Sequence, residues 1–464
     1  MNRHLLVRRP VVLLALAGLA LSSAACGGPG TPSVDGGTDG PGPWDPLDPN
    51  TAVTLSIDCM PPTSKPAERK QWVDDVEAFR KLYPRVTLTS KDAFPCEEPA
   101  AFGAQLKAGT QSDLYYSYFT DLGKVLEADA AEDISAYVND KSVPALGDID
   151  LSVLTTLKHD EKLYGLPISN YKMGLIYNRK LFARAGLDPD KPPTSWPEVR
   201  EAARKIAALG GGVNGYGDYS TGNQGGWHFT AELYGLGGAV TTPAGSKADF
   251  NTPDGRKVLQ NLHDMRWTDN SMGTEQGLKW PDLMTRMAAD KLGMYVGAPD
   301  DITYMVQTLK GNYNDYGMGP MPGGGAALLG GADYIFKKGL TPDQIKAGIA
   351  WINFKFLTIG KGQFDYARTR NDGLPVGLPQ PFFFVGGSLK ADNRAKAAAA
   401  TVPVDNYAPY LANPVPGKIE PPYAQQIYKI LDAAVAAVLK DRNADIPKLL
   451  ADAESQVNQL LAQT

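Results

Sequence analysis

The stretch LYGLPISNYKMGLIYNRKLFARAGLDPDKPPTSWPE, residues 163–198, decides the fold that we expect for this chain. It contains an apolar strand at 173–178, an amphipathic turn that ends at Gly186, a pair of prolines, and Ser195 followed by Glu198 in the spacing of a helix capping box. Such a dense series of boundary signals predicts that one α/β unit ends here and that a second one begins.

Strands and helices alternate upstream of this stretch. The apolar patterns predict strands over 51–57, 86–90 and 113–119, and amphipathic helices over 71–83 and 100–109. This βαβαβ order is typical of a mostly parallel sheet with helices on both faces.

The alternation restarts downstream and ends in helices. A buried strand is expected over 291–297, and helices are expected over 255–267 and 341–357. Two further amphipathic helices, over 423–439 and 446–461, close the chain. The sequence therefore predicts two α/β lobes with a helical C-terminal region.

Length and composition agree with this division. A body of about four hundred residues is too long for one compact core, so two domains are expected. The chain is 43% hydrophobic and 21% charged, with a formal net charge of -5. A nucleic-acid-binding protein needs a basic face, so no nucleic acid partner is expected.

Residues 1–26 have the layout of a secretory signal. Three arginines near the start are followed by the apolar run 11–21 and by small residues directly before Cys26. The end of the segment resembles a bacterial lipobox, which predicts that Cys26 carries a lipid, although Ser23 stands where that motif usually has Leu. The alternative is ordinary cleavage near Ala25.

Residues 27–50 are rich in Gly, Pro and Asp and predict a disordered tether. A flexible segment of this length reaches roughly 25 Å. It would hold a globular body just off the outer face of a membrane.

The chain has three cysteines. If Cys26 is lipidated, Cys59 and Cys96 remain, each shortly after a predicted strand, and an exported protein can keep a disulfide between them. Two buried free thiols are the alternative. The spacing supports neither a redox C-x-x-C pair nor a zinc site.

A series of short motifs carries a family resemblance. The opening stretch supplies four of them: Tyr164-Gly165-x-Pro167, Leu175-x-Tyr177-Asn178, Ala185-Gly186-Leu187 and Pro192-Pro193-Thr194-x-Trp196-x-Glu198. AFRKLYPRVTL and LKAGTQSDLYY precede them, and FNTPDGRKVLQNL, GMYVGAPDD, YGMGPMPGG, GGADYIF and DGLPVG follow in order. Over nearly all of residues 51–464, the series resembles the bacterial extracellular solute-binding proteins of the maltose-binding class (family 1).

The resemblance implies a two-lobed periplasmic-binding-protein-like fold of type II. The N-terminal lobe would comprise 51–167 and 320–362, and the C-terminal lobe would comprise 168–319 and 363–464. Residues 167–171 would form a hinge, and the lobes would close around a ligand by rotation.

A ligand is expected between the lobes, at the carboxyl ends of strands. Sugars offer apolar C–H faces ringed by hydroxyl groups, so we expect aromatic rings together with carboxylates and Arg. The candidate ligand-binding residues are Trp227, Tyr118, Phe119, Asp300, Asp301, Gly330, Gly331, Arg370, Asp372, Tyr423, Tyr171 and Trp280.

Most candidates have a structural alternative. Tyr118 or Phe119 could pack under the next helix, and either aspartate of the pair Asp300 and Asp301 could cap the helix that follows. Trp280 could be a packing residue and Tyr171 a hinge residue alone. Arg370 could pair with Asp372 on the surface.

The resemblance implies a monomeric receptor of an ABC importer that binds a carbohydrate, favoured as an oligosaccharide, and passes it to the permease. No catalytic residue, metal or cofactor is expected. Two alternatives stay open: the same fold with a polyamine or phosphodiester ligand, and an exported glycoside hydrolase with paired carboxylates. No HExxH, GxSxG or GxxxxGK[ST] stretch is present.

Overall fold

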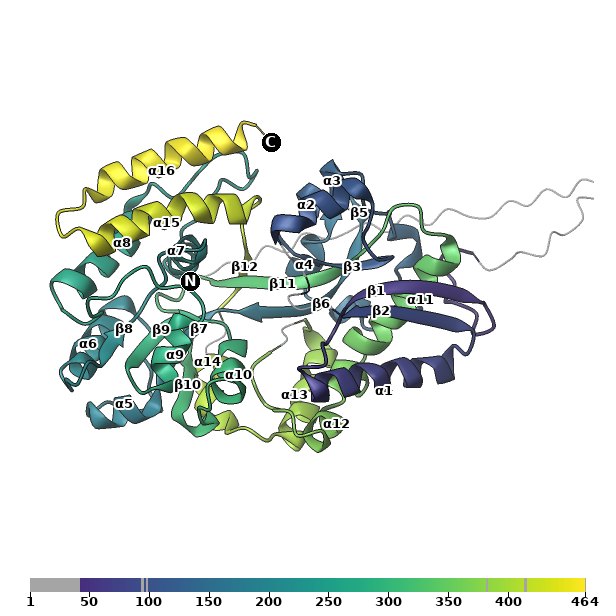
Figure 1. Ribbon diagram of the computed structural model, residues 1–464, viewed down its shortest axis with the longest axis horizontal. Coiled ribbons are helices and arrows are strands. Elements are labelled where there is room, and N and C mark those ends of the chain that lie inside the picture. The colour runs from purple at the N-terminus through teal and green to yellow at the C-terminus, as the bar shows by residue number, and fades with distance from the viewer. Residues whose placement is uncertain (1–41, 93–95, 97–98, 381–382, 413–414, 464) are drawn as a thin grey trace, which may run out of the picture. The chain divides into compact units, whose positions relative to one another are not determined.

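The computed structural model describes residues 42–463 except 93–95, 97–98, 381–382 and 413–414 (Figure 1). The signal segment, Cys26 and most of the expected tether lie outside the described residues. Residues 43–464 form one compact unit. Within the described part of the chain, no helix has both the length and the apolar character needed to cross a bilayer.

The first lobe is built on a six-stranded sheet. Five of its strands follow the order β12-β11-β3-β1-β2, and the sixth strand, β6, pairs with β11. β1 pairs in parallel with β2 and β3, as predicted, whereas β11 runs antiparallel to β3 and β6. The strands are β1 (Val53–Met60), β2 (Val86–Asp92), β3 (Leu114–Tyr118), β6 (Gly165–Lys172), β11 (Ala327–Phe336) and β12 (Gly417–Ile419). The larger helices of this lobe are α1 (Pro66–Leu82), α2 (Pro99–Ala108) and α11 (Pro342–Ile352).

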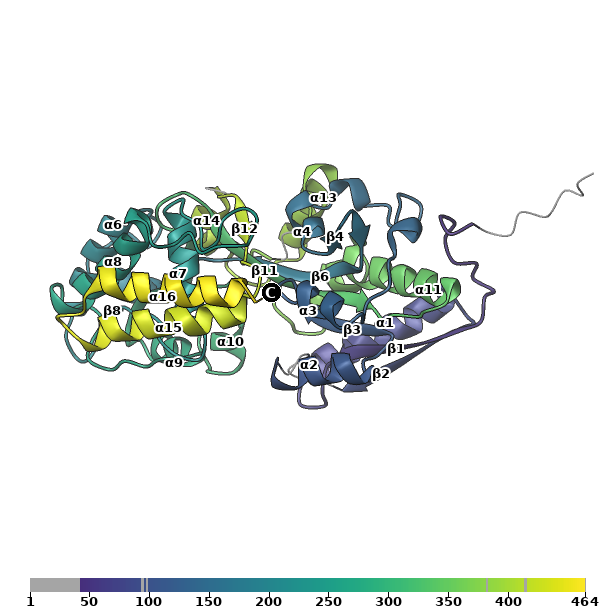
Figure 2. The same cartoon turned by 90° about the horizontal axis from the view of Figure 1, so that it is seen from above.

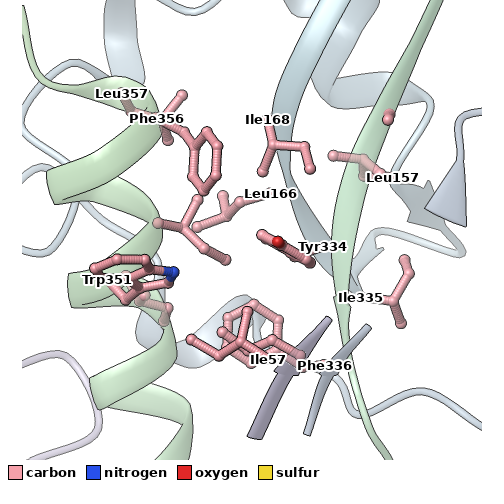
Figure 3. Close-up of a cluster of buried hydrophobic side chains, with 14 of the residues drawn as sticks. Ile57, Leu157, Leu166, Ile168, Tyr334, Ile335, Phe336, Trp351, Phe356 and Leu357 are labelled. Atoms are coloured by element: carbon pink, nitrogen blue, oxygen red, sulfur yellow. The ribbon is translucent and has the colours of Figure 1, made fainter. Parts of the chain in front are cut away.

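The core of the first lobe joins segments that are distant in the sequence. Figure 3 shows Ile57 of β1, Leu166 of β6 and Tyr334 of β11 facing Trp351 of α11, and all four are fully buried. Burying a large apolar side chain of this kind contributes about 1.5–3 kcal/mol. The chain must therefore leave this lobe and return to complete its core.

The second lobe contains a four-stranded sheet with the order β10-β7-β9-β8. Its strands are β7 (Gly174–Asn178), β8 (Asn214–Tyr216), β9 (Leu292–Gly297) and β10 (Tyr316–Gly319). Its helices include α6 (Trp196–Ala207), α7 (Gln224–Gly235), α8 (Pro253–Trp267), α9 (Asp282–Ala288), α10 (Asp300–Gln307), α15 (Ala424–Lys440) and α16 (Ile446–Leu461). The predicted capping box begins α6, where the Ser195 N–H donates to Glu198 Oε2 at 3.0 Å. The predicted helical end is α15 and α16, which pack side by side (Figures 1 and 2).

The paired strands β6 and β11 run from one lobe to the other (Figures 1 and 2). On β6, Ile168 belongs to the first core, and Met173 just beyond the strand belongs to the second. On β11, Leu328 belongs to the second core and Tyr334 to the first. The segment expected to form the hinge, residues 167–171, lies within this crossing strand.

Residues 363–399 pack with the first lobe, which differs from the expected boundary at 363. Phe364, Phe383 and Ala399 belong to the first core, and the Val385 N–H donates to the Asp148 carbonyl at 2.7 Å. Two helices of this segment, α12 (Tyr366–Asn371) and α13 (Gly386–Ala399), pack against each other. An amphipathic pattern shows which face of a helix is buried but does not show which lobe covers it.

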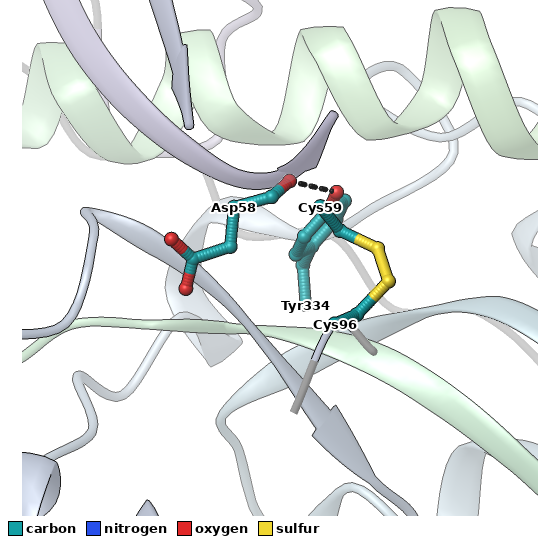
Figure 4. The surroundings of a disulfide bond; sticks show 4 residues. All are labelled: Asp58, Cys59, Cys96 and Tyr334. Atoms are coloured by element: carbon teal, nitrogen blue, oxygen red, sulfur yellow. Dashed lines mark hydrogen bonds between the residues drawn. A yellow bond between two sulfur atoms is a disulfide. The ribbon is translucent and has the colours of Figure 1, made fainter. Parts of the chain in front are cut away.

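Two features tie down the start of the globular body. Leu47 is buried in the first core and the Asn139 side chain donates to the Trp44 carbonyl at 3.0 Å, so residues 44–47 of the expected tether pack on the first lobe. Cys59 and Cys96 form the expected disulfide, with their Cα atoms 4.9 Å apart (Figure 4). The bond links the segment after β2 to the end of β1.

Candidate ligand-binding site

The carboxyl end of β3 brings two tyrosines toward the boundary between the lobes. The Tyr116 and Tyr118 rings lie edge to face with centroids 5.4 Å apart, and both side chains are half-buried. Phe119, by contrast, is buried in the first core. The packing alternative therefore holds for Phe119, while Tyr118 remains a candidate.

Gly330 and Gly331 of β11 make room for aromatic side chains of the protein itself. A Cβ atom on Gly330 would lie 2.3 Å from Tyr171 Oη, and one on Gly331 would lie 2.4 Å from Phe119 Cε2. We expected these glycines to let a ligand approach the backbone. The contacts show that each accommodates an aromatic ring instead.

Tyr171 lies on β6 where residues of both lobes meet. Its ring is edge to face with that of Trp227, with centroids 6.3 Å apart. Burial, followed by the nearby Glu420 and Asp300 carboxyl groups, raises the pKa of the Tyr171 hydroxyl well above its usual value. Tyr118 acts on the same hydroxyl. Tyr171 is thus more than a hinge residue, because it connects the aromatic groups of the first lobe with the carboxyl groups of the second.

The glycines around Trp227 had suggested that it lies in a loop before a helix. It lies instead in the first turn of α7. Those glycines serve helix packing, because a Cβ atom on Gly226 would lie 2.3 Å from the Tyr428 carbonyl oxygen on α15. The half-buried Trp227 ring contacts Tyr171 and His228. Close packing of α7 on α15 positions this ring beside β6.

A buried polar network supports the Trp227 turn. His228 Nδ1 bonds Asp218 Oδ1, and Tyr216 Oη donates to Glu232 Oε1 at 2.9 Å. Burial, and then Asp218, raises the pKa of Glu232 well above its usual value. Sequence reasoning missed this network. The signal was Glu232, which stands between the apolar residues Ala231 and Leu233 of α7.

Trp280 is 41% exposed and so is not a core residue. Its indole Nε1 donates to Asp301 Oδ1 at 3.3 Å, and its ring centroid lies 4.6 Å from that of Tyr304 on α10. The Trp280 N–H donates to the side chain of Gln224 at the start of α7. These contacts place Trp280 beside the helix that carries Trp227.

Asp300 and Asp301 begin α10, but neither caps it, because Pro299 is the N-cap and no side chain caps the helix. Asp301 is buried and also accepts from Tyr295 Oη at 3.1 Å. Burial, and then Asp300, raises the pKa of Asp301 to about 8. Asp300 is exposed, and yet desolvation by the surrounding protein raises its pKa.

The EPPY stretch supplies two site residues, of which we had predicted only Tyr423. Glu420 is half-buried and accepts from Tyr428 Oη at 2.9 Å, and burial raises its pKa to about 7. Tyr423 Oη donates to Glu127 Oε1 at 2.9 Å. Glu127 ends α3 (Leu122–Glu127) of the first lobe, so this bond connects the two lobes.

Arg370 and Asp372 do not join the cluster. Asp372 accepts from Gln71 Nε2 and pairs with Lys70 Nζ, each at 3.2 Å, and both partners lie on α1. Arg370 is exposed on α12. Asp372 therefore fastens α12 to α1 of the first lobe, and the expected pair of Arg370 with Asp372 is replaced by contacts with α1.

The site thus gathers aromatic rings and carboxyl groups from both lobes around β6. The described residues hold no group of three His, Cys, Asp or Glu side chains that could bind a metal ion. The clustered residues are Tyr116, Tyr118, Tyr171, Trp227, Trp280, Asp300, Asp301, Tyr304, Glu420 and Tyr423.

A family model described as bacterial extracellular solute-binding protein matches residues 63–354. The chain belongs to this family. A putative binding protein of Brucella abortus is 35% identical over 112 residues, which span 24% of this chain and 26% of that relative's length. The sn-glycerol-3-phosphate-binding periplasmic protein UgpB of Brucella melitensis is 27% identical over 315 residues, covering 65% of this chain and 67% of the relative.

Solved structures show the same fold. The cyclic alpha-maltosyl-1,6-maltose binding protein of Arthrobacter globiformis has a TM-score of 0.70 at 20% identity and covers 89% of this chain and 100% of its own. The GacH receptor of Streptomyces glaucescens, described in complex with acarbose, has a TM-score of 0.64 at 17% identity. The match covers 89% of this chain and 99% of that receptor. UgpB of Mycobacterium tuberculosis, in complex with glycerophosphocholine, has a TM-score of 0.65 at 14% identity. The match covers 89% of this chain and 99% of that protein. The two-lobed solute-binding fold predicted from the sequence is confirmed.

Proposed function

We propose that this protein is the receptor of an ABC importer and that it captures a carbohydrate between its lobes. The observation that carries the proposal is the position of Tyr171. It lies on a strand that crosses between the lobes and beside Trp227, Asp300 and Glu420 of the second lobe. A ligand held against these groups would contact the crossing strand itself, so hinge closure and binding would be coupled.

The chemistry of the site favours a carbohydrate. Aromatic rings such as Trp227 and Trp280 offer flat apolar surfaces for sugar C–H faces, and carboxyl groups accept hydrogen bonds from hydroxyl groups. Several proteins of the same fold are described with sugars or sugar analogues. The glycerol phosphate and glycerophosphocholine relatives raise a second candidate, a phosphate ester. An anion would need Arg or Lys, whereas the groups around Tyr171 are acids and hydroxyls.

We further propose that the protein is exported as a monomer and held on the outer face of the membrane by a lipid on Cys26. The family is extracellular. The burial of Leu47 against the first core would attach the tether to the N-terminal lobe and leave the second lobe free to rotate.

The test is a thermal unfolding screen of a soluble form that begins at residue 42. The panel contains mono- and oligosaccharides, polyamines, amino acids and phosphodiesters. A ligand present at about a hundred times its dissociation constant should stabilise the protein by about 2.7 kcal/mol. Stabilisation by a carbohydrate that is recovered intact supports the proposal. A sugar that is cleaved would support the hydrolase alternative, and a response to phosphodiesters alone would overturn the carbohydrate assignment.

A further inference from the structure

Three carboxyl groups of the site have no basic partner. None of the ion pairs formed within the described part of the chain involves Asp300, Asp301 or Glu420. Asp301 bonds Trp280 and Tyr295, and Glu420 bonds Tyr428. Their hydrogen-bond partners are therefore neutral side chains.

Two lysines near this part of the chain, Lys124 and Lys172, have partners elsewhere, and Lys418, two residues before Glu420, donates to the Gly238 carbonyl at 2.8 Å. Lys124 of α3 is engaged by Asp121 in an ion pair. Lys172 follows Tyr171 on β6, and successive side chains of a strand point to opposite faces. Its Cε atom lies 3.2 Å from where a Cβ atom on Gly417 would stand, and the acid that acts on it is Asp150. In the described part of the chain, none of these lysines forms an ion pair with Asp300, Asp301 or Glu420.

The residues assigned to this site supply carboxyl groups and tyrosine hydroxyls, so the site combines strong acceptors with neutral donors, and no cationic donor is among those residues. A hydroxyl group both donates and accepts a hydrogen bond, so a site for neutral sugars is best served by donors and acceptors together. Carboxylates only accept when ionised. A protonated amine only donates, and it is attracted both to carboxylates and to the faces of aromatic rings.

The aromatic rings complete the match. Trp280 is exposed and packs against Tyr304, while its indole nitrogen holds Asp301, the immediate neighbour of Asp300. The Tyr171 and Trp227 rings contact each other, and the Asp300 and Glu420 carboxyl groups both act on the Tyr171 hydroxyl. Cation–π contacts are stronger when the cation and the ring are desolvated.

We propose that the ligand is an amino-substituted carbohydrate whose protonated amine is held between Asp300 and Glu420, with its rings against Trp227 and Trp280. This inference rests on the proposed receptor function and specifies its substrate class. It also implies that binding releases protons to the solvent, because an ammonium group favours the ionised form of the carboxyl groups around it.

The experiment compares two oligosaccharides of equal length, one of glucosamine and one of N-acetylglucosamine, by titration calorimetry on the mature exported protein. A malto-oligosaccharide, spermidine and glycerophosphocholine complete the panel. We expect the glucosamine oligomer to bind at least tenfold more tightly than either neutral sugar. We also expect this advantage to shrink as salt is raised, because ionic contacts near the surface are screened. Titration in two buffers of different ionisation enthalpy should show proton release.

Variants locate the effect. Asp300→Asn and Glu420→Gln should each weaken binding of the glucosamine oligomer at least severalfold more than binding of the N-acetylglucosamine oligomer. Asp129→Asn is the matched control, because its carboxylate is 87% exposed and lies 3.9 Å from Lys338 Nζ. It should change neither affinity. Unfolding curves of all three variants establish that they are folded.

The outcomes separate this inference from the receptor function. Equal or tighter binding of a neutral sugar would overturn the inference that the ligand carries an amine, and it would leave the proposed carbohydrate receptor function intact. Binding of spermidine without any sugar would retain a cationic site but contradict the carbohydrate, and so would overturn the inference. Binding of glycerophosphocholine alone, or of no compound by a folded protein, would overturn both.

Discussion

At the scale of single residues, Trp227 is the clearest candidate for a ligand contact. Its ring is half-buried, faces Tyr171, and sits on a helix turn held in place by Asp218 and His228 beneath it. A ring that is fixed by its own helix loses little freedom when a sugar stacks on it. Trp227 should therefore carry a large share of the binding free energy.

Trp227→Ala should weaken carbohydrate binding by about 1–3 kcal/mol, because stacking area is lost while the carboxyl groups remain. Titration calorimetry measures the loss. Trp44→Ala is the control, since that side chain is 60% exposed and lies before the first strand, outside the site. Unchanged affinity in Trp227→Ala would remove this residue from the site.

Asp301 predicts a pH dependence of stability. Its pKa is raised from an unfolded value of about 3.9 to about 8 by burial and by Asp300. The stabilisation from burying it in the neutral form is complete below about pH 4 and is lost as pH rises toward 8, by at most about 1.4 kcal/mol per pH unit.

Asp301→Asn removes this ionisation and keeps one acceptor oxygen, which can serve Trp280 Nε1, while the new amide N–H can donate to the Tyr295 hydroxyl. The unfolding temperature of the variant should therefore gain on that of the wild type between pH 5 and pH 8. Differential scanning fluorimetry across that range measures the difference. Parallel curves for the two proteins would show that Asp301 does not titrate there.

At the scale of elements, the site depends on how α7 packs against α15. Gly226 allows this contact, since its missing Cβ would fall on the Tyr428 backbone. The same contact brings Tyr428, the hydrogen-bond donor to Glu420, close to the turn that carries Trp227. One helix–helix interface thus sets the positions of an aromatic ring and a carboxyl group.

Gly226→Ala should destabilise the protein by about 1–3 kcal/mol, because the backbone of α15 must move to admit the methyl group. It should also weaken ligand binding. Gly103→Ala on α2 is the control, because nothing lies within 4 Å of the added atom. That change should leave stability equal or raise it by about 0.5–1 kcal/mol. Chemical denaturation of both variants checks the pair, and equal stabilities would contradict the close packing.

The whole molecule is held in its present arrangement by β6, β11 and the bond from Tyr423 to Glu127. The two strands are continuous covalent connections, whereas the bond between Tyr423 and Glu127 joins the lobes only while they lie as they do here. Its rupture would accompany any rotation that separates α3 from the start of α15.

Tyr423→Phe should shift the population of lobe arrangements by about 0.5–1.5 kcal/mol, the net worth of one hydrogen bond. Small-angle X-ray scattering without ligand should then report a changed radius of gyration. Tyr177→Phe is the control, because that hydroxyl bonds Pro189 within the second lobe. Identical scattering of wild type and Tyr423→Phe would show that the bond does not bias the lobes.

Local patterns predicted much of the fold because they depend on neighbours in the chain. The capping box at Ser195, the first three strands and the two closing helices all follow from spacing within one element. The disulfide of Cys59 with Cys96 followed because few cysteines were available to pair. The sequence did not predict that residues 363–399 pack with the first lobe, because a helix pattern shows which face is buried but not which surface covers it.

The sequence by itself determined the class of fold and the kinds of side chain that a site would use, because hydrophobic period, turn residues and aromatic motifs are written locally. Only the tertiary structure decided which of those side chains meet. Phe119 packs in the first core, Asp372 pairs with Lys70 of α1, and Gly330 makes room for the Tyr171 side chain. Glu420, which no motif had singled out for binding, joins the candidate site through its bond from Tyr428. These outcomes depend on contacts between segments far apart in the chain, and such contacts are fixed by packing and burial rather than by local spacing.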